Sequence, residues 1–213
     1  MTTSVSGLVW YASYGSNLYR DRFVVYLRGG TAPGGSRPQR GARDPSDPLD
    51  DRPLTIDRAL FFRGQSQLWG GGVAAIDHEP GSEAARGRAY LITMAQFEDV
   101  VAQESRRETT PIDLGAANGD GHHLAGPGPY DRLELVDNWD GVPVATFTHP
   151  EPRSAHDPRP PSAAYLTTIV KGLRDSHRMD DDTIADYLLS ASGVGLGWTE
   201  TSLGELLLSA RTS

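Results

Sequence analysis

The sequence predicts an α+β fold, in which helices pack outside a mostly antiparallel or mixed sheet. Strand-like and helix-like segments are intermixed along the 213 residues, but the strict strand–helix alternation of a doubly wound parallel sheet is missing. In addition, no segment between the polar loops is large enough to hold a core of its own. We therefore expect one domain over residues 1–213, with a long Gly/Pro/Arg/Asp-rich loop at 28–53 and a short C-terminal helix.

The first expected elements are a strand, a turn and a helix within residues 5–27. Residues 9–11 are β-branched or aromatic, as in strands. The chain then bends, because Gly15 accepts positive φ and Asn17 tolerates left-handed conformations. A strand that enters a helix through such a turn leaves backbone N–H groups in one concavity, where an anion can bind. An ordinary Gly-Ser-Asn turn is the alternative.

Residues 28–53 contain almost no apolar side chains and many Gly, Pro, Arg and Asp residues. This composition buries no core, so we expect a long irregular surface loop. Loops of this length inside a compact domain are uncommon and are often functional. The loop is either a lid over an active site or a mobile insertion.

The central segments are expected to alternate between strands and a well-capped helix. Strands are expected at 54–64, at 73–76 after the triple glycine, and at the end of 81–93. The helix over 93–108 begins with a capping box, in which Thr93 caps the helix and Gln96 completes the box. Its apolar face carries Phe97, Val100 and Val101.

The remaining residues predict a hairpin followed by helices. Residues 109–129 are Gly-rich and are expected to be irregular, and residues 151–161 form a polar linker. The expected strands are 131–137 and 142–149, which pair through a turn at Asp140-Gly141. The expected helices are 162–177, 180–193 and 201–210, and Ser162 is the expected N-cap of the first of them.

Composition limits the possible functions. The absence of cysteine excludes disulfides, thiolate catalysis and Cys-ligated zinc, and it is consistent with a cytoplasmic protein. The net charge of −8 argues against a nucleic-acid partner. The sequence has no apolar run long enough to span a membrane, so we expect no transmembrane helix, and we expect no signal peptide because the first residues lack a basic start and a long apolar core. A small organic substrate is expected, and the sequence leaves the oligomeric state open.

The sequence does not support three common kinds of site: a serine-hydrolase triad, a metal site and a dinucleotide-binding loop. Ser16 is not in a G-x-S-x-G elbow, and no motif selects a histidine partner for it. The pair His122-His123 lies in a Gly-rich stretch without metal-ligand spacing, so we expect ordinary loop histidines and no metal site. The "GVGLG" stretch at 193–197 follows a helix, whereas a dinucleotide-binding fingerprint follows a strand.

Glu104 closes the helix that begins at Thr93. Phe97, Val101 and Glu104 are spaced by four and three residues, so Glu104 lies near the apolar face. A carboxylate in that position is costly unless it is paired or protonated. The alternative is a surface glutamate that pairs with neighbouring arginines.

Four short motifs occur in a fixed order along the chain. They are Tyr14-Gly15-Ser16-Asn17-Leu18, then Ser66, Trp69, Gly71 and Gly72 before a strand, then Gln103-Glu104 at a helix end, and finally Pro161-Ser162-Ala163-Ala164-Tyr165 with Ile169 to Gly172. In these motifs and their order, over roughly residues 8–190, the chain resembles the gamma-glutamylcyclotransferases and their bacterial relatives. A tyrosine associated with that family corresponds here to Phe147.

The resemblance implies a compact mixed β-barrel flanked by helices, with the glycine-serine loop and Glu104 facing one cavity. It also implies an activity that releases 5-oxoproline and a free amine from a gamma-glutamyl amide, with no cofactor. Glu104 would be the general acid and base. The residues expected to bind substrate are Tyr14, Gly15, Ser16, Asn17, Leu18 and Tyr165.

Two alternatives remain open. Tyr165 is equally well explained as a core aromatic on its helix. The same cavity would also suit a non-catalytic small-molecule-binding or regulatory protein.

Overall fold

A computed structural model describes residues 7–32, 37–81, 83–117, 122–124 and 128–211. They fall into two compact units, each built from three segments of the chain. Unit 1 comprises residues up to 13, 23–54 and 88–150, and unit 2 comprises 14–22, 55–87 and 151 onward. Neither unit is one continuous stretch, and the expectation of a single domain stays a prediction.

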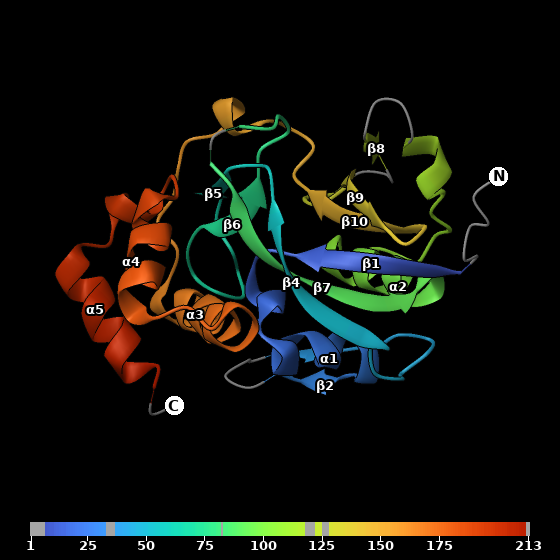
Figure 1. Ribbon diagram of the computed structural model, residues 1–213, viewed down its shortest axis with the longest axis horizontal. Coiled ribbons are helices and arrows are strands. Elements are labelled where there is room, and N and C mark those ends of the chain that lie inside the picture. Colours follow the sequence, from blue (N-terminus) through green and yellow to red (C-terminus); the bar gives the residue numbers. More distant parts are fainter. Residues whose placement is uncertain (1–6, 33–36, 82, 118–121, 125–127, 212–213) are drawn as a thin grey trace. The chain divides into compact units, whose positions relative to one another are not determined.

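The largest sheet has six strands in the order β4-β7-β1-β10-β9-β8 (Figure 1). The strands are β1 (Leu8–Ser13), β4 (Asp50–Ile56), β7 (Ala85–Thr93), β8 (His122–Leu124), β9 (Arg132–Trp139) and β10 (Val142–Thr148). β1 runs parallel to β10 and antiparallel to β7, whereas β9 is antiparallel to both of its neighbours. The expected α+β class with a mixed sheet is confirmed.

The compact mixed β-barrel implied by the resemblance is not found in the part of the chain that the structure describes. Its six-stranded sheet is open, with β4 and β8 at the edges. Closure would require these edge strands to pair. β8 has only three residues, and β5 (Leu60–Arg63) and β6 (Val73–Ile76) pair with each other in a separate sheet.

Three further boundaries differ from expectation. The strand expected over 54–64 is two strands, because β4 ends at Ile56 and β5 begins at Leu60. The stretch 109–129 is not wholly irregular, since it contains the 3-10 turn η2 (Leu114–Ala117) and strand β8. The His122-His123 pair therefore belongs to a strand, where its backbone pairs with β9. Residues 118–121 and 125–127 lie outside the described residues.

The hairpin β9–β10 was predicted by its turn residues. Asp140 and Gly141 both have positive φ, at 54° and 84°, as a two-residue hairpin turn of the primed type requires. Val142 pairs with Trp139, and the register shifts once between Val144 and Ala145.

The core of unit 1 is rich in stacked aromatic rings. Tyr11 of β1 stacks on Phe147 of β10 with ring centroids 5.3 Å apart, and Phe23 stacks on Tyr90 at 4.0 Å. Phe97 of α2 (Met94–Glu104) is fully buried beside them. Phe147 therefore acts as a packing residue here, and aromatic pairs of this kind add to the energy gained from burial alone.

Helix α2 begins as the sequence predicts. The Thr93 hydroxyl accepts a hydrogen bond from the Gln96 N–H at 3.1 Å, and the Gln96 side chain accepts one from the Thr93 N–H at 3.0 Å. Phe97, Val100 and Val101 are fully buried. The capping box and the apolar face of this helix are confirmed.

The segment 28–53 is more ordered than expected. It follows α1 (Arg20–Arg28), carries the short hairpin strands β2 (Gly30–Thr31) and β3 (Pro38–Gln39), and ends in β4. Residues 33–36 within it lie outside the described residues. The Gln96 side chain donates hydrogen bonds to the Asp44 and Ser46 carbonyls at 3.2 and 2.9 Å, which ties the segment to α2.

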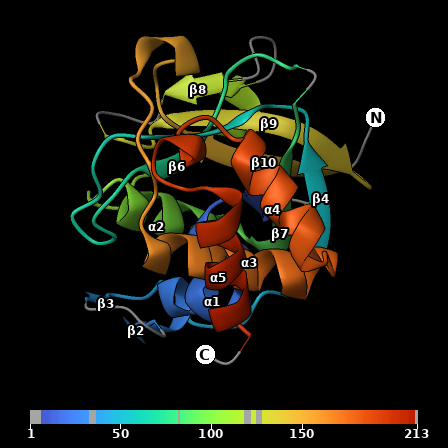
Figure 2. The ribbon, with the colours of Figure 1, turned by 90° about the vertical axis from the view of Figure 1, so that its left-hand side faces the viewer.

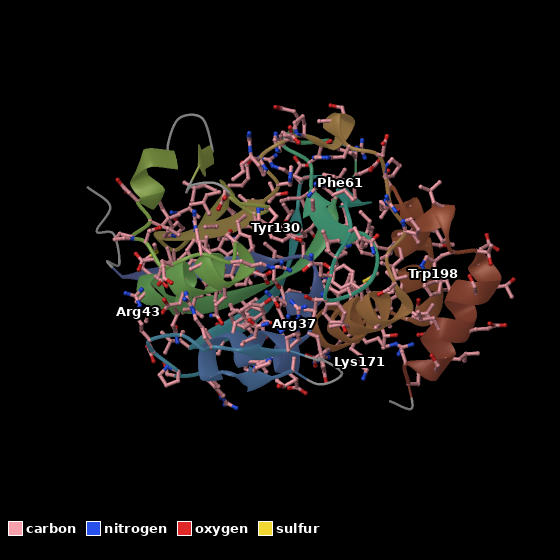
Figure 3. The ribbon with its side chains drawn as sticks, turned by 180° about the vertical axis from the view of Figure 1, so that it is seen from behind. Arg37, Arg43, Phe61, Tyr130, Lys171 and Trp198 are labelled. Atoms are coloured by element: carbon pink, nitrogen blue, oxygen red, sulfur yellow. The ribbon has the colours of Figure 1, made fainter. Side chains whose placement is uncertain are left out.

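Arg43, which is labelled in Figure 3, also attaches the segment to α2. Its backbone N–H donates to the Asp99 carboxylate at 2.8 Å, and its guanidinium contacts Asp99 at 3.0 Å and Glu98 at 2.8 Å. Asp99 is only 2% exposed. Replacing this segment by a short linker would leave a buried carboxylate without its main donors, so we expect a clear loss of stability. The two interpretations of residues 28–53, as a lid or as a mobile insertion, stay predictions.

The Asp99 network makes stability depend on pH. Burial by itself would raise the pKa of Asp99, but the Arg43 N–H, the Thr109 hydroxyl and the Arg43 guanidinium outweigh burial and hold that pKa below its usual range. A carboxylate with a depressed pKa stabilises the fold above its unfolded-state pKa, and this contribution disappears as the pH falls through the folded-state value.

We therefore expect acid to weaken the wild type more than the variant Asp99→Asn. Urea unfolding at about pH 6 and about pH 3 measures the change in the free energy of unfolding for each protein. The wild type should lose more stability between these two pH values than the variant does, because the amide of the variant has no charge to lose. An equal loss in the two proteins would contradict this role for Asp99.

Unit 2 contains the three C-terminal helices that the sequence predicts. They are α3 (Ala163–His177), α4 (Asp181–Ser190) and α5 (Glu200–Ser209), and Figure 2 shows them beside one another. The Ser162 hydroxyl caps α3 by accepting from the Tyr165 N–H at 3.3 Å, as expected. Short 3-10 turns complete the unit: η1 (Ser16–Leu18), η3 (Arg153–Ala155) and η4 (Val194–Leu196).

None of the helices in the described residues is both long and apolar enough to cross a membrane.

Candidate functional site

The Tyr14–Leu18 segment forms the tight turn that the sequence predicts. The Leu18 N–H donates to the Gly15 carbonyl at 3.0 Å, and the Tyr19 N–H donates to the Ser16 carbonyl at 3.2 Å. Helix α1 then begins at Arg20. The reason given for Gly15 is wrong, however, because its φ is −111° and not positive.

The close approach of the Tyr165 hydroxyl, and not a positive φ, explains the glycine at position 15. A Cβ atom added to Gly15 would lie 2.9 Å from the Tyr165 hydroxyl and 3.5 Å from the Ala74 Cβ. The Ala74 N–H donates to the same hydroxyl at 3.3 Å. The absence of a side chain at position 15 thus lets the Tyr165 hydroxyl lie directly against the turn.

Tyr165 is buried among aromatic rings, and its hydroxyl reaches the turn at Gly15. It is 4% exposed, and its ring lies 5.1 Å from the Trp69 ring and 6.2 Å from the Phe62 ring. The ring is therefore a core aromatic, while the hydroxyl reaches the turn at Gly15. Contact between this hydroxyl and a substrate stays a prediction.

Gly172 lets α3 pack closely against the same turn. A Cβ at Gly172 would lie 2.5 Å from the Leu18 carbonyl carbon and 2.6 Å from the Tyr19 nitrogen. Both are backbone atoms, which cannot move aside like the end of a flexible side chain. The glycine of the I-x-x-G motif is therefore explained by helix-to-turn packing.

We predict that Gly172→Ala destabilises the protein. Alanine favours a helix interior by roughly 0.5–1 kcal/mol over glycine, but crowding of this kind costs about 2 kcal/mol or more, so the clash should win. Gly204→Ala in α5 is the matched control, since a Cβ there meets no atom within 4 Å. Denaturant unfolding should show opposite signs for the two variants. If Gly172→Ala is as stable as Gly204→Ala, α3 does not pack on the turn as described.

Gly71 and Gly72 lie against the segment that starts α3. A Cβ at Gly71 would meet the Ser162 nitrogen at 2.7 Å, and one at Gly72 would overlap the Arg159 carbonyl. The Gly72 N–H donates to the Pro160 carbonyl at 2.9 Å. The W-x-G-G motif and the P-S-x-x-Y motif therefore meet in space, within unit 2.

The turn also holds backbone donors that the rest of the described chain does not use. Neither the Gly15 nor the Ser16 N–H donates a hydrogen bond to another described residue. The side chains of Ser16 and Asn17 are buried, at 9% and 4% exposed. Such amides need an acceptor from solvent or a ligand, which is what an anion cradle provides. The cradle itself stays a prediction.

Arg22 is a residue of this region that the sequence analysis missed. It is 3% exposed, and its guanidinium carbon lies 5.8 Å from the centre of the Trp69 ring. A buried arginine on an aromatic face brings a positive charge next to the residues that surround the turn. In the sequence, Arg22 is one of several arginines near the start of a helix, so no local signal distinguishes it.

Glu104 lies in unit 1, as the last residue of α2, and is half-buried. The helix end that carries it is fixed on both sides. The Gln103 side chain donates to the Tyr26 carbonyl at 2.9 Å, and the Arg107 guanidinium lies 3.1 Å from the buried Asp131 carboxylate. These contacts fix the backbone at Glu104 within unit 1.

The predicted residues are thus divided between the units. The structure brings Gly15, Leu18 and Tyr165 together in unit 2, with Tyr14, Ser16 and Asn17 in the same turn. Glu104 belongs to unit 1. The expectation that Glu104 and the turn face one cavity stays a prediction.

Comparisons with solved structures identify the fold. An uncharacterized protein from Homo sapiens is 17% identical, with a TM-score of 0.53 over 97% of this chain and 99% of that one. A gamma-glutamyl cyclotransferase is 16% identical, with a TM-score of 0.52 over the same shares of the two chains. The chain shares their fold. At this level of identity the likeness concerns the fold alone.

A curated sequence gives a second comparison. Histone deacetylase 5 of Arabidopsis thaliana is 29% identical in an alignment 198 residues long that covers 84% of this chain. The chain spans only 30% of the length of that protein, so the likeness concerns a part of it. No model of a known protein family matches the chain.

Proposed function

We propose that this protein is a gamma-glutamylcyclotransferase-like enzyme, which releases 5-oxoproline and a free amine from a gamma-glutamyl amide. The observation that carries the proposal is the meeting of the P-S-x-x-Y and I-x-x-G residues of α3 with the Tyr14–Leu18 turn. Gly15 gives access to the Tyr165 hydroxyl, Gly172 seats α3 on Leu18, and unused amides remain in the turn. A fold shared with a gamma-glutamyl cyclotransferase supports it.

The chemistry needs no nucleophile from the protein. The α-amine of the substrate gives up a proton and its nitrogen attacks the γ-carbonyl carbon, which forms the ring bond. The amide C–N bond then breaks, and the leaving amine takes up a proton. No water is consumed, so the products are 5-oxoproline and the amine in equal amounts. Ring closure is intramolecular, and holding the glutamyl chain folded accounts for much of the rate.

We assign the proton transfers to Glu104. A carboxylate accepts the proton that the attacking α-amine loses on ring closure and returns it to the leaving amine. Helix stability does not explain a glutamate at the end of α2. The helix macrodipole opposes a negative charge at a helix C-terminus, at a cost of about 0.3–1 kcal/mol. The anchors at Gln103 and Arg107 would hold such a group in place through the reaction.

We assign the turn to the developing oxyanion or the substrate carboxylate. Backbone donors at positions 15–17 suit either anion, and one donor to an oxyanion is typically worth about 3–4 kcal/mol of transition-state stabilisation. Tyr165 would orient the substrate beside the turn through its hydroxyl.

The test uses a panel of gamma-glutamyl amides, with 5-oxoproline followed by mass spectrometry. The matched control is the same amide with its α-amine acetylated, which removes the proposed nucleophile and keeps the γ-carbonyl. We expect 5-oxoproline only from the free amines. Binding without any turnover across the panel would contradict the proposal and support the non-catalytic alternative on the same fold.

A further inference from the structure

Unit 1 has an open hollow of about 580 Å³ on the side of α2 where the helix ends. Two segments line it, one at the end of strand β3 and one around the end of α2. The lining residues are Gln39, Arg40, Ala102, Gln103, Arg106, Arg107 and Glu108.

Positive charge predominates in the hollow. Arg40 and Arg106 are exposed, and neither forms an ion pair with any described residue. Arg40 donates one hydrogen bond, to the Thr109 hydroxyl at 2.8 Å. The charge of Arg107 is balanced by Asp131, whereas Glu108 is the single carboxylate among the lining residues.

Arg106 occupies a backbone position where glycine is the usual residue. Its φ is 54°, its N–H donates to the Gln103 carbonyl at 3.3 Å, and the Arg107 N–H donates to the Ala102 carbonyl at 2.9 Å. These two bonds form a Schellman motif, whose left-handed residue is normally glycine because a Cβ is disfavoured there. The way in which α2 ends therefore does not explain why residue 106 is an arginine.

We propose that this hollow binds a small dianion, either a phosphate group or a dicarboxylate. Guanidinium groups pair with phosphate and carboxylate oxygens through two parallel N–H bonds. Arg40 and Arg106 supply two such guanidinium groups from different segments of the chain. One ligand with two negative charges therefore pairs with both groups. The inference uses residues of unit 1 alone and does not depend on the proposed activity.

The test is isothermal titration with sodium phosphate, glycerol phosphate and succinate, each at constant ionic strength set with sodium chloride. Arg106→Gly removes the guanidinium while favouring the turn, so weaker binding cannot result from a damaged helix end. Arg40→Gln removes the second guanidinium group. Arg52→Gln is the matched control, since it removes one exposed positive charge elsewhere in unit 1.

We expect saturable binding of at least one dianion by the wild type. Each hollow variant should weaken it about tenfold, as expected for the loss of a charge-assisted pair, and Arg52→Gln should not. Arg106→Gly should also melt no lower than the wild type. Phosphate binding without succinate binding would assign the phosphate group, and glycerol phosphate binding would show that an organic ester fits. Absence of saturable binding, or equal weakening by Arg52→Gln, would overturn the proposal.

Discussion

Glu104→Gln is expected to lower turnover at least about a hundredfold, the usual contribution of a general base. Glutamine has nearly the same size and remains half-buried, so the fold should be kept. The loss should fall on kcat, because the proton transfers occur in the reaction and not in binding. The measurement is the rate of 5-oxoproline release at saturating substrate, together with a thermal melt.

Glu205→Gln provides the control for this prediction. Glu205 is exposed on α5 and undergoes the same chemical change. It should release 5-oxoproline at the wild-type rate. A near-wild-type rate for Glu104→Gln would remove Glu104 from the mechanism and leave the proton transfers without an assigned group.

Gly15→Val is expected to impair activity far more than Ser16→Ala. A Cβ at position 15 already comes to 2.9 Å from the Tyr165 hydroxyl, and the two methyl groups of valine add further crowding. The turn must then shift, which moves its amides away from the substrate. We expect a loss of about a hundredfold or more, the range for losing an oxyanion donor. Ser16→Ala keeps its amide, so its loss should stay below about tenfold.

A double variant separates this clash from general misfolding. Tyr165→Phe removes the atom that a Cβ at position 15 would meet, so Gly15→Ala should cost less activity in the Tyr165→Phe background than alone. Equal costs in both backgrounds would contradict the close-approach argument. Loss of all activity in Ser16→Ala, with fold and substrate binding intact, would replace substrate-internal cyclisation with a serine-dependent mechanism.

Local side-chain chemistry was predictable from the sequence. The Thr93–Gln96 capping box, the Ser162 cap and the Asp140-Gly141 hairpin turn depend on residues within three positions of one another. Interactions of such short range leave a readable pattern of residue types.

Long-range pairing was not predictable in the same way. Arg43 and Asp99 are 56 residues apart, and each looks like an ordinary charged residue in its own segment. Their contact turns the 28–53 segment from an expected surface loop into one attached to α2. Barrel closure could not be predicted either, because it depends on which distant edge strands pair and not on any local motif.

The physical reason for the glycine at position 15 was predicted wrongly. Gly15 was expected to serve a positive φ, whereas it gives room to Tyr165 from a helix far along the sequence. Both causes require glycine, so the sequence cannot distinguish them. Arg22 carried no signal of its own, and Gly172 belonged to the I-x-x-G motif without a predicted role, since the roles of both depend on Trp69 and Leu18 in three dimensions.

The central claim is that the substrate's own amine, and not water, attacks the γ-carbonyl. Running the reaction in ¹⁸O-labelled water tests it most directly, with both possible products followed by mass spectrometry. Cyclisation consumes no water, so the account predicts unlabelled 5-oxoproline in an amount equal to the released amine. Release of glutamate that carries one ¹⁸O atom would show hydrolysis and would contradict the account.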